Sequence, residues 1–311
     1  MILIPVKEAC RLTSSAEQTI RNWIDEGKLS KHNDEKGKTL IDKRELLLQF
    51  PTVISLYNFK GGTAKSSSAI LLADFFDKQG IKCLVVDLDA QSNATLAFAK
   101  LEDLIVDGKY RLSLYDYFND HTSLHKIVFK YNENIDILPS RLELCEKTDI
   151  DSIELLNLKE DFYTLFKKYS VVIVDCPPSL NALSRLGILL ANYILIPFLP
   201  EPFSYYGIGN MLNSVKKIIQ YNKDFIAYRV FVSIHKSHKT NIREDYINSI
   251  KEQLSEKVFE NTIPDFIGVV ERGTIRKNIF EMYEKDKSIE RILLLMKEID
   301  NFLYEEREIK G

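Results

Sequence analysis

A glycine- and lysine-rich turn between a predicted strand and a predicted helix constrains this chain more than any other stretch. Residues 53–57 have the composition of a strand, residues 69–76 have helical spacing, and Lys60-Gly-Gly-Thr-Ala-Lys-Ser66 lies between them. Such a turn points successive backbone N–H groups and a helix N-terminus at an anion. Lys65 is then placed to reach the outer phosphates of a nucleotide, and the Ser66 hydroxyl to hold Mg²⁺.

The loop departs from the strict P-loop pattern. That pattern is Gly-x-x-x-x-Gly-Lys-[Ser/Thr], and Phe59 and Ala64 stand where its two glycines belong. The loop instead carries a second lysine, Lys60, at its front. A glycine-containing turn before a helix is the alternative for this stretch taken alone, so the rest of the chain must decide between the two.

Size and composition favour a globular protein with one large α/β domain and a small appendage. The chain has 311 residues, of which 45% are hydrophobic and 28% charged. Its formal net charge of -3 excludes a uniformly basic protein, so any contact with nucleic acid has to come from local patches. The four cysteines form no C-x-x-C pair and are expected to be free thiols in a reducing cytoplasm. The apolar runs end well short of the ~20 residues that cross a bilayer, and the start lacks a basic region, so neither a membrane span nor a signal peptide is expected.

Apolar, strand-like runs alternate with amphipathic helical stretches from residue 53 onward. This alternation predicts a doubly wound α/β fold with a mostly parallel sheet that helices cover on both faces. Ligands in such folds bind beyond the carboxyl ends of the strands. The predicted core strands are 53–57, 83–87, 135–138, 171–174, 194–197 and 228–234.

Carboxylates follow two of these strands directly. Asp87 and Asp89 come after the apolar residues of the second strand, and Asp175 ends the run Val171-Val-Ile-Val-Asp175. Carboxylates placed there are costly unless they serve a metal ion or an attacking water. A carboxylate at the end of a buried strand beside a phosphate loop is the Walker-B arrangement, which accepts hydrogen bonds from the water shell of Mg²⁺. Each aspartate alone fits a helix cap or a loop as well, but the three together with the loop predict a nucleotide site.

Residues 1–50 form a separate unit by pattern. Two short helical stretches are joined by the turn Thr13-Ser-Ser15, which supplies N-cap residues, and the second stretch ends at Gly27. Gly37 can turn a two-stranded wing, and Asp42 can cap a last helix. Two helices joined by a tight turn make a helix-turn-helix. The apolar faces of its helices are Val6, Ala9 and Leu12, then Ile20, Trp23 and Ile24.

This order of elements resembles the winged helix-turn-helix domains of the MerR and excisionase type. The resemblance is carried by Pro5-Val-Lys-Glu-Ala-Cys-x-Leu-Thr13 and by Thr19-Ile-Arg-Asn-Trp-Ile-Asp-Glu-Gly-Lys-Leu29. It implies that the second helix enters a major groove of DNA and that two such modules pair to gain affinity. A protein-interaction or dimerisation module is the alternative. The implied DNA contacts are Ser15, Glu17, Gln18, Thr19 and Arg21 on the helix, and Lys28, Lys31, Lys36 and Lys38 on the wing.

The chain from residue 51 to residue 311 resembles the ParA/MinD group of deviant Walker-A ATPases, and within it the ParA/Soj partition branch. No single motif is specific, but their combination is. The motifs are Asn58-x-Lys-Gly-Gly-x-x-Lys-Ser66, Val86-Asp-Leu-Asp-x-Gln-x-Asn93, Ile137-Leu-Pro-Ser140, Asp175-Cys-Pro-Pro-Ser-Leu180, and Leu195-Ile-Pro197 with Glu201 and Gly207. A looser match continues through Lys239-Thr-Asn241 and Thr262-Ile-Pro264 to Glu271.

The resemblance implies a Mg²⁺-dependent ATPase that forms a sandwich dimer when it binds ATP. Lys60 is the signature lysine, which reaches the partner's nucleotide and stabilises charge on the transferring phosphoryl group. Lys65 binds the phosphates of its own subunit, and Asp89 orients the attacking water. Ser66, Asp87 and Asp175 hold Mg²⁺, partly through water. The implied ATP-binding residues are Lys60, Gly61, Gly62, Thr63, Ala64, Lys65, Ser66, Ser67, Pro264 and Asp265.

The resemblance also implies partners and a place of action. ATP-bound dimers of this group coat nucleoid DNA without sequence preference, and a centromere-binding ParB-like partner stimulates their slow hydrolysis. Many relatives carry arginines directly after the Ile-Pro pair, where this chain has Asp265-Phe-Ile-Gly268. The nonspecific DNA surface is therefore expected from other basic residues, with solvated helix ends as the alternative. These residues are Lys236, Lys239, Arg243, Arg272, Arg276 and Lys277.

Ala64 is the second departure, because relatives have glycine before the catalytic lysine. If the backbone there requires a positive φ, alanine costs about 1–2 kcal/mol of strain. The leading hypothesis is a plasmid or chromosome partition ATPase whose front module binds operator DNA and represses its own operon. One alternative is a MinD-like membrane-associated ATPase, which the weakly basic C-terminal tail disfavours. The other is a transcriptional regulator in which ATP is only a dimerisation switch.

Overall fold

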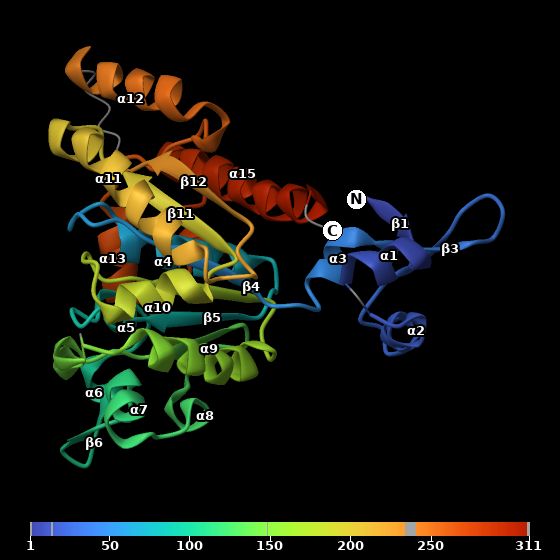
Figure 1. Ribbon diagram of the computed structural model, residues 1–311, viewed down its shortest axis with the longest axis horizontal. Coiled ribbons are helices and arrows are strands. Elements are labelled where there is room, and N and C mark those ends of the chain that lie inside the picture. Colours follow the sequence, from blue (N-terminus) through green and yellow to red (C-terminus); the bar gives the residue numbers. More distant parts are fainter. Residues whose placement is uncertain (1, 14, 148, 234–240, 310–311) are drawn as a thin grey trace.

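A twisted, mostly parallel sheet forms the centre of the protein (Figure 1). The computed structural model describes residues 2–13, 15–147, 149–233 and 241–309. Within these residues the central sheet has seven strands in the order β12-β11-β4-β10-β5-β9-β8, all parallel except β8, which runs antiparallel to β9. The strands are β4 (Thr52–Leu56), β5 (Cys83–Asp87), β8 (Phe129–Lys130), β9 (Ile135–Leu138), β10 (Val171–Asp175), β11 (Tyr193–Phe198) and β12 (Ala227–Val232).

Helices cover both faces of this sheet, as the alternation of patterns predicts. Successive strand residues point to opposite faces, so Val53 packs into one core and Ile54 into the other. One face carries α7 (Leu114–Asp120), α8 (Leu124–Ile127), α9 (Ser152–Phe166), α10 (Ala182–Leu190), α11 (Pro202–Ile219) and α12 (Asn241–Leu254). The other carries α4 (Lys65–Lys78), α5 (Asn93–Phe98), α13 (Gly268–Ile275), α14 (Ile279–Met282) and α15 (Lys287–Ile309).

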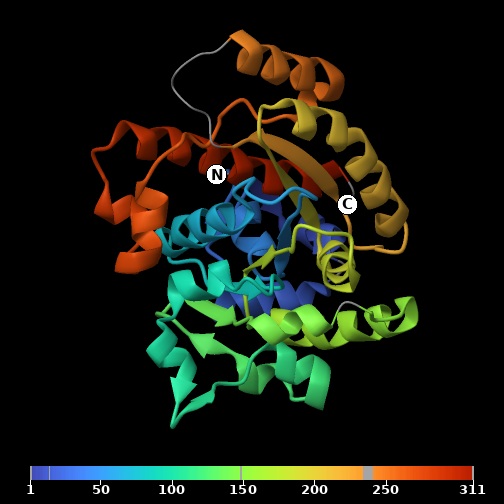
Figure 2. The same ribbon diagram turned by 90° about the vertical axis from the view of Figure 1, so that its left-hand side faces the viewer.

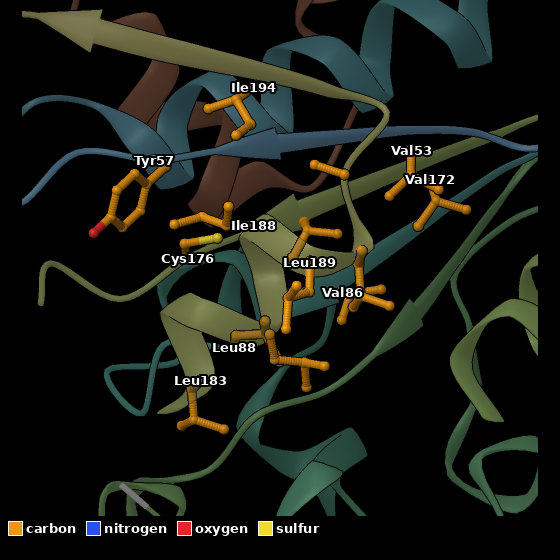
Figure 3. Close-up of a cluster of buried hydrophobic side chains, with 14 of the residues drawn as sticks. Val53, Tyr57, Val86, Leu88, Val172, Cys176, Leu183, Ile188, Leu189 and Ile194 are labelled. Carbon is orange, nitrogen blue, oxygen red and sulfur yellow. The ribbon is translucent and has the colours of Figure 1, made fainter. Parts of the chain in front are cut away.

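The core under α10 shows how tightly the first face is packed. Figure 3 shows side chains of β4, β5 and β10 meeting those of α10, among them Val53, Val86, Val172 and Leu189. A Cβ at Gly187 would lie 2.4 Å from the Cys176 sulfur, so only glycine lets α10 approach the sheet this closely. The parallel register of β4, β10 and β5 places the carboxyl ends of these strands together at one edge of the sheet.

Smaller elements extend the central unit. A β-hairpin and short helical turns lie between α5 and α7 and around β9 and α12. They are α6 (Leu101–Leu104), β6 (Ile105–Val106), β7 (Lys109–Tyr110), η1 (Leu142–Glu146) and η2 (Ser255–Lys257). Among the described residues, no helix combines the length and apolar character that a membrane crossing needs.

Residues 3–47 form a separate small layer with a core of its own. Its elements are β1 (Leu3–Pro5), α1 (Val6–Thr13), α2 (Glu17–Asp25), β2 (Lys31–Asn33), β3 (Thr39–Asp42) and α3 (Lys43–Leu47). β2 and β3 pair as an antiparallel hairpin that turns at Gly37, whose φ is +74°. The Asp42 side chain caps α3 by accepting a 2.8 Å bond from the Arg44 amide, as expected. The N-cap of α2 is Ala16, which makes no side-chain capping bond, so the expected capping by the turn 13–15 is wrong.

Arg44 fastens this small layer to the C-terminal helix. Its guanidinium donates a 2.9 Å hydrogen bond to Asp300 of α15 and lies 5.2 Å from the centre of the Tyr304 ring. Leu48 packs into the core between the sheet and α15, and Phe50 meets Trp23 edge-on at 5.7 Å. The layer therefore contacts the central unit at the end of the sheet where β4 begins, and in Figure 2 it lies behind the sheet.

Candidate active site

The loop between β4 and α4 has the backbone that a phosphate cradle requires. Gly62 and Ala64 both have a positive φ, +71° and +69°, and α4 begins directly afterwards at Lys65. Asn58 holds the front of the loop, because its side chain accepts a 3.0 Å bond from the Lys60 amide and donates a 2.7 Å bond to the Pro197 carbonyl. Ala64 therefore lies in the left-handed region, where an L-residue with a Cβ has a strained backbone.

Lys65 is held inside the loop that it follows. Its ammonium group donates a 2.9 Å hydrogen bond to the Lys60 carbonyl, and only 6% of the residue is exposed. Burial lowers the pKa of Lys65, while the negative charge of Asp175 opposes this shift. A buried cation at a helix N-terminus is placed to bind phosphate oxygens.

Three aspartates lie at the carboxyl edge of the sheet beside this loop. Asp87 and Asp175 are opposite each other on the neighbouring strands β5 and β10, and both are fully buried. Asp87 accepts bonds from the Thr95 amide at 2.8 Å and the Thr95 hydroxyl at 2.7 Å. Burial raises the pKa of Asp87 to about 7, against the opposing effect of the Thr95 bonds. Asp89 follows the strand and lines the cleft above.

Asp175 differs from Asp87 in that its side chain has no hydrogen-bond partner among the described residues. Neither of its carboxylate oxygens accepts a hydrogen bond from any described residue. Burial, followed by the negative charge of Asp87, raises the pKa of Asp175 well above its usual range. The nearby Ser66 hydroxyl opposes this shift, although it does not reach hydrogen-bond geometry. A buried carboxylate is normally satisfied, so this one indicates a missing ligand. Oxygen ligands from Ser66, Asp87 and Asp175 fit Mg²⁺ and its water shell.

A cleft of about 650 Å³ opens beside the loop and the aspartates. The phosphate side is lined by Gly61, Gly62, Ala64, Lys65, Ser66 and Ser67, and Pro264 and Asp265 line the other side, as the resemblance implies. Thr63 does not line the cleft, because it is buried with its hydroxyl directed to the Lys60 carbonyl. The cleft lining also includes residues that the sequence reasoning did not assign to the ATP site, namely Ile70, Gln91, Asn93, Leu96, Ala97, Pro178, Ile263, Phe266, Val269, Val270 and Gly273.

Lys60 is set apart from its own cleft. Its ammonium group forms an ion pair with Glu201 at the start of α11. Lys60 lines a second hollow of about 370 Å³ together with Phe203 and Gly207. Phe203 is 82% exposed. The sequence flagged Glu201 only as part of a motif and offered no signal for its pairing with Lys60.

The predicted DNA contacts of the small layer lie on its surface. Arg21 pairs with Glu17 on α2, and Gln18 donates to Asn22. Lys28 pairs with Glu26 beyond the helix. Ser15 and Thr19 are half-buried, and the exposed candidates are Glu17, Gln18, Arg21, Lys28, Lys31, Lys36 and Lys38.

The predicted DNA contacts of the central unit differ in how far they are exposed. Arg272 is wrong as a DNA contact, because it is fully buried and bound to Asp74. Arg276 is half-buried and donates to the Leu96 carbonyl at 3.0 Å. Arg243 is half-buried on α12 and Lys277 is exposed, whereas Lys236 and Lys239 lie outside the described residues.

Known proteins resemble the chain in sequence and in fold. A family model described as AAA domain matches residues 51–227. Sporulation initiation inhibitor protein Soj of Bacillus subtilis is 25% identical over 253 residues, which cover 79% of this chain and 97% of that protein. McdA of Cyanothece in complex with ATP has a TM-score of 0.66 at 19% identity, covering 79% of this chain and 95% of that one. Cobyrinic acid a,c-diamide synthase of Mycobacterium smegmatis with a bound ATP analog and magnesium has a TM-score of 0.62 at 21% identity, covering 76% and 96%.

These comparisons agree with the loop, the strand-end aspartates and the sheet order. The structural likenesses establish the fold, an α/β P-loop NTPase with a mostly parallel sheet. The family model spans more than half of the chain, and the sequence relatives include both Soj and the chromosome partitioning protein ParA of Myxococcus xanthus. The chain belongs to the ParA/Soj-type family of partition ATPases.

Proposed function

We propose that this chain is a DNA-partition ATPase that binds ATP and Mg²⁺ in the described cleft, dimerises on ATP and hydrolyses it slowly. The observation that carries the proposal is Asp175, a fully buried carboxylate without a hydrogen-bond partner among the described residues, at a strand end beside Lys65. Mg²⁺ bound there supplies positive charge to the phosphates. Lys65 binds the outer phosphates, and Asp89, at the cleft wall, orients water.

Lys60 supports the dimer. Its ammonium group is paired with Glu201 outside its own cleft, in a hollow that also contains the exposed Phe203. Exposed aromatic side chains such as Phe203 are enriched at protein interfaces, which favours a contact with a second copy here. We infer that Lys60 acts on the nucleotide of a second copy, where its charge would stabilise the transferring phosphoryl group.

Residues 1–50 are proposed as a winged-helix DNA-binding domain and residues 51–311 as the ATPase domain. Exposed Gln18 and Arg21 lie on α2, and Lys31, Lys36 and Lys38 lie on or beside the β2–β3 hairpin. A helix with exposed polar side chains and a basic hairpin on the same small layer fit a groove and its flanking phosphates. We infer that this domain binds operator DNA and thereby represses the operon that encodes the protein. Nonspecific DNA binding would use basic residues such as Lys277 and Arg243, and a ParB-like protein would stimulate hydrolysis at the nucleoid.

The membrane-associated alternative loses its main support. The apolar face of α15 is packed into the core, where Ile292, Leu295, Ile299 and Phe302 are almost completely buried. An amphipathic helix whose apolar face is already covered has nothing to insert into a bilayer. The alternative of a transcriptional regulator, in which ATP is only a dimerisation switch, is supported by Ala64. The strained backbone of Ala64 directly precedes Lys65, the lysine that binds the phosphates.

The test compares the full-length wild type with Asp175→Asn. ATP hydrolysis is measured with and without nonspecific duplex DNA, and DNA binding is measured with and without ATP. Wild type is expected to bind duplex DNA only with ATP and Mg²⁺, and Asp175→Asn to lose both activities. Asp136→Asn on β9 is the control, because Asp136 is a buried acid bonded to Tyr169 away from the cleft. The partition proposal fails if wild type binds no DNA in any nucleotide state. Hydrolysis that stays negligible while ATP-dependent DNA binding persists would favour the switch-only regulator.

A further inference from the structure

Glu201, directly before α11, holds the Lys60 ammonium group away from the ATP cleft. The two side chains form an ion pair in which Lys60 is 36% and Glu201 32% exposed. The Glu201 carboxylate makes no capping bond to α11, and its Oε1 has no hydrogen-bond partner among the described residues. Lys60 is therefore the polar contact that the structure gives to this carboxylate.

The backbone of Lys60 is fixed, whereas its side chain is free to turn. The Lys60 amide donates a 3.0 Å bond to the Asn58 side chain, and the Lys60 carbonyl accepts a 2.9 Å bond from the Lys65 ammonium group. Asn58 also donates a 2.7 Å bond to the Pro197 carbonyl on β11, four positions before Glu201. The base of Lys60 is thus tied to the segment that carries Glu201. Because the lysine stem is flexible, the ammonium group can leave Glu201 without any backbone movement.

The pair has the strength of a contact that binding can break. Gly61 and Gly62 line the ATP cleft, while Lys60 lines the second hollow beside Phe203. An ion pair that is about one third exposed adds little to stability, so stability does not explain it. Glu201 also lies at the N-terminus of an 18-residue helix, where negative charge is favoured. Its carboxylate therefore stays stable when Lys60 leaves, and it can accept Lys60 again.

We propose that Glu201 is a positioning residue that restrains Lys60 in the single subunit, so that one such pair must break in each subunit before two copies close over ATP. The proposal rests on the proposed function, in which Lys60 acts on the nucleotide of a second copy. Glu201 then opposes dimer formation. It sets the protein concentration at which hydrolysis begins, because Lys60 exchanges Glu201 for the phosphates of the partner's nucleotide.

The test measures the dimer dissociation constant of the full-length protein by sedimentation velocity, with Mg²⁺ and a non-hydrolysable ATP analogue. Glu201→Gln keeps the shape of the side chain and removes its charge. It is expected to tighten the dimer about fivefold, because each dimer breaks two pairs and each exposed pair is worth only a few-fold. The protein concentration that gives half-maximal ATP hydrolysis should fall by about the same factor.

Asp224→Asn is the matched control. Asp224 forms a 2.8 Å ion pair with Lys159 and is 52% exposed, but it precedes β12 at the amino edge of the sheet, away from the cleft. Removing its charge should leave the dimer dissociation constant within about twofold of wild type. A second comparison adds Glu201→Gln to Lys60→Ala. Since the pair is already absent there, the added change should shift the dimer dissociation constant less than about twofold.

The outcomes separate restraint of Lys60 from other roles of Glu201. Equal tightening with and without Lys60 would show that Glu201 acts on the interface directly, and it would overturn the proposal. A weaker dimer or slower hydrolysis in Glu201→Gln would show that Glu201 guides Lys60 to its target, which also overturns it. So would an unchanged dimer dissociation constant in a Glu201→Gln protein whose circular dichroism matches wild type. A wild type that binds the analogue but stays monomeric at every concentration would instead refute the proposed function.

Discussion

Replacing Ala64 by glycine should make this protein more stable, although glycine usually weakens folded chains. The Ala64 backbone has φ +69° and ψ +30°, the left-handed region, where an L-residue with a Cβ is strained by about 1–2 kcal/mol. Glycine removes this strain but costs about 0.4–1 kcal/mol, because its unfolded chain is more flexible. The difference is a gain of roughly 0.5–1 kcal/mol, which for a domain of this size raises Tm by about 1–4 °C.

The assay is thermal and urea unfolding of the nucleotide-free protein, followed by circular dichroism. Ala69→Gly is one control, because Ala69 lies completely buried inside α4, so the exchange should cost at least about 1 kcal/mol from helix propensity and lost packing. Gly62→Ala is the other. Gly62 has φ +71°, and a Cβ there would meet no atom of the described residues within 4 Å, so any loss reflects backbone strain alone. The reasoning is refuted if Ala64→Gly loses stability as Ala69→Gly does.

Three further predictions concern the acids, the front lysine and the small layer. The pKa of Asp175 is raised in the folded state above its unfolded value, so its ionisation costs stability as pH rises through the raised pKa. Asp175→Asn should therefore be more stable than wild type at pH 8 with EDTA and lose that advantage toward pH 4, and urea midpoints that are equal at pH 8 would contradict this. Lys60→Ala should slow ATP hydrolysis about a hundredfold or more. ATP affinity should stay within about threefold of wild type, because Lys60 is paired with Glu201 outside its own cleft. A loss of ATP affinity as large as the loss of hydrolysis, measured in a binding titration, would contradict a role of Lys60 in the partner's site. Asp42→Ala should destabilise α3 by about 1 kcal/mol, because it removes the N-cap bond to the Arg44 amide. Hydrogen exchange at the Arg44 amide should become faster, and an unchanged exchange rate would show that the cap does not stabilise α3.

The elements that follow a strong periodic pattern were predictable from the sequence. The strands predicted at 53–57 and 83–87 appear as Thr52–Leu56 and Cys83–Asp87, because a strand buried on both faces must be apolar throughout. Asp87 and Asp175, at the ends of β5 and β10, were found for the same reason, since charge is unexpected at the end of a buried strand. The short β8 was missed, because two residues at a sheet edge carry no pattern.

Burial of charged groups was not predictable, and this explains the error at Arg272. A basic residue in a helical segment looks the same in the sequence whether it faces solvent or a buried acid. The available signal was Asp74, a carboxylate in the middle of the apolar stretch 69–76, which requires a cation somewhere in the fold. The sequence alone does not say which cation, because Arg272 lies almost two hundred positions away. The cleft wall at Phe266 and Val269 was missed for a related reason, since only the packing of α13 brings it to the cleft.

The fastening of the small layer by Arg44 has a consequence for assembly on DNA. The layer precedes β4, whose five residues span roughly 16 Å and lead away from it to the phosphate loop. In a dimer that meets through its nucleotide clefts, two such spans, together with the loops and nucleotides between them, separate the layers by more than the ~34 Å between half-sites on one face of a duplex. If α2 reads DNA as proposed, the two α2 helices of one dimer would then fit half-sites two or more helical turns apart, or two separate DNA segments, but not half-sites one turn apart.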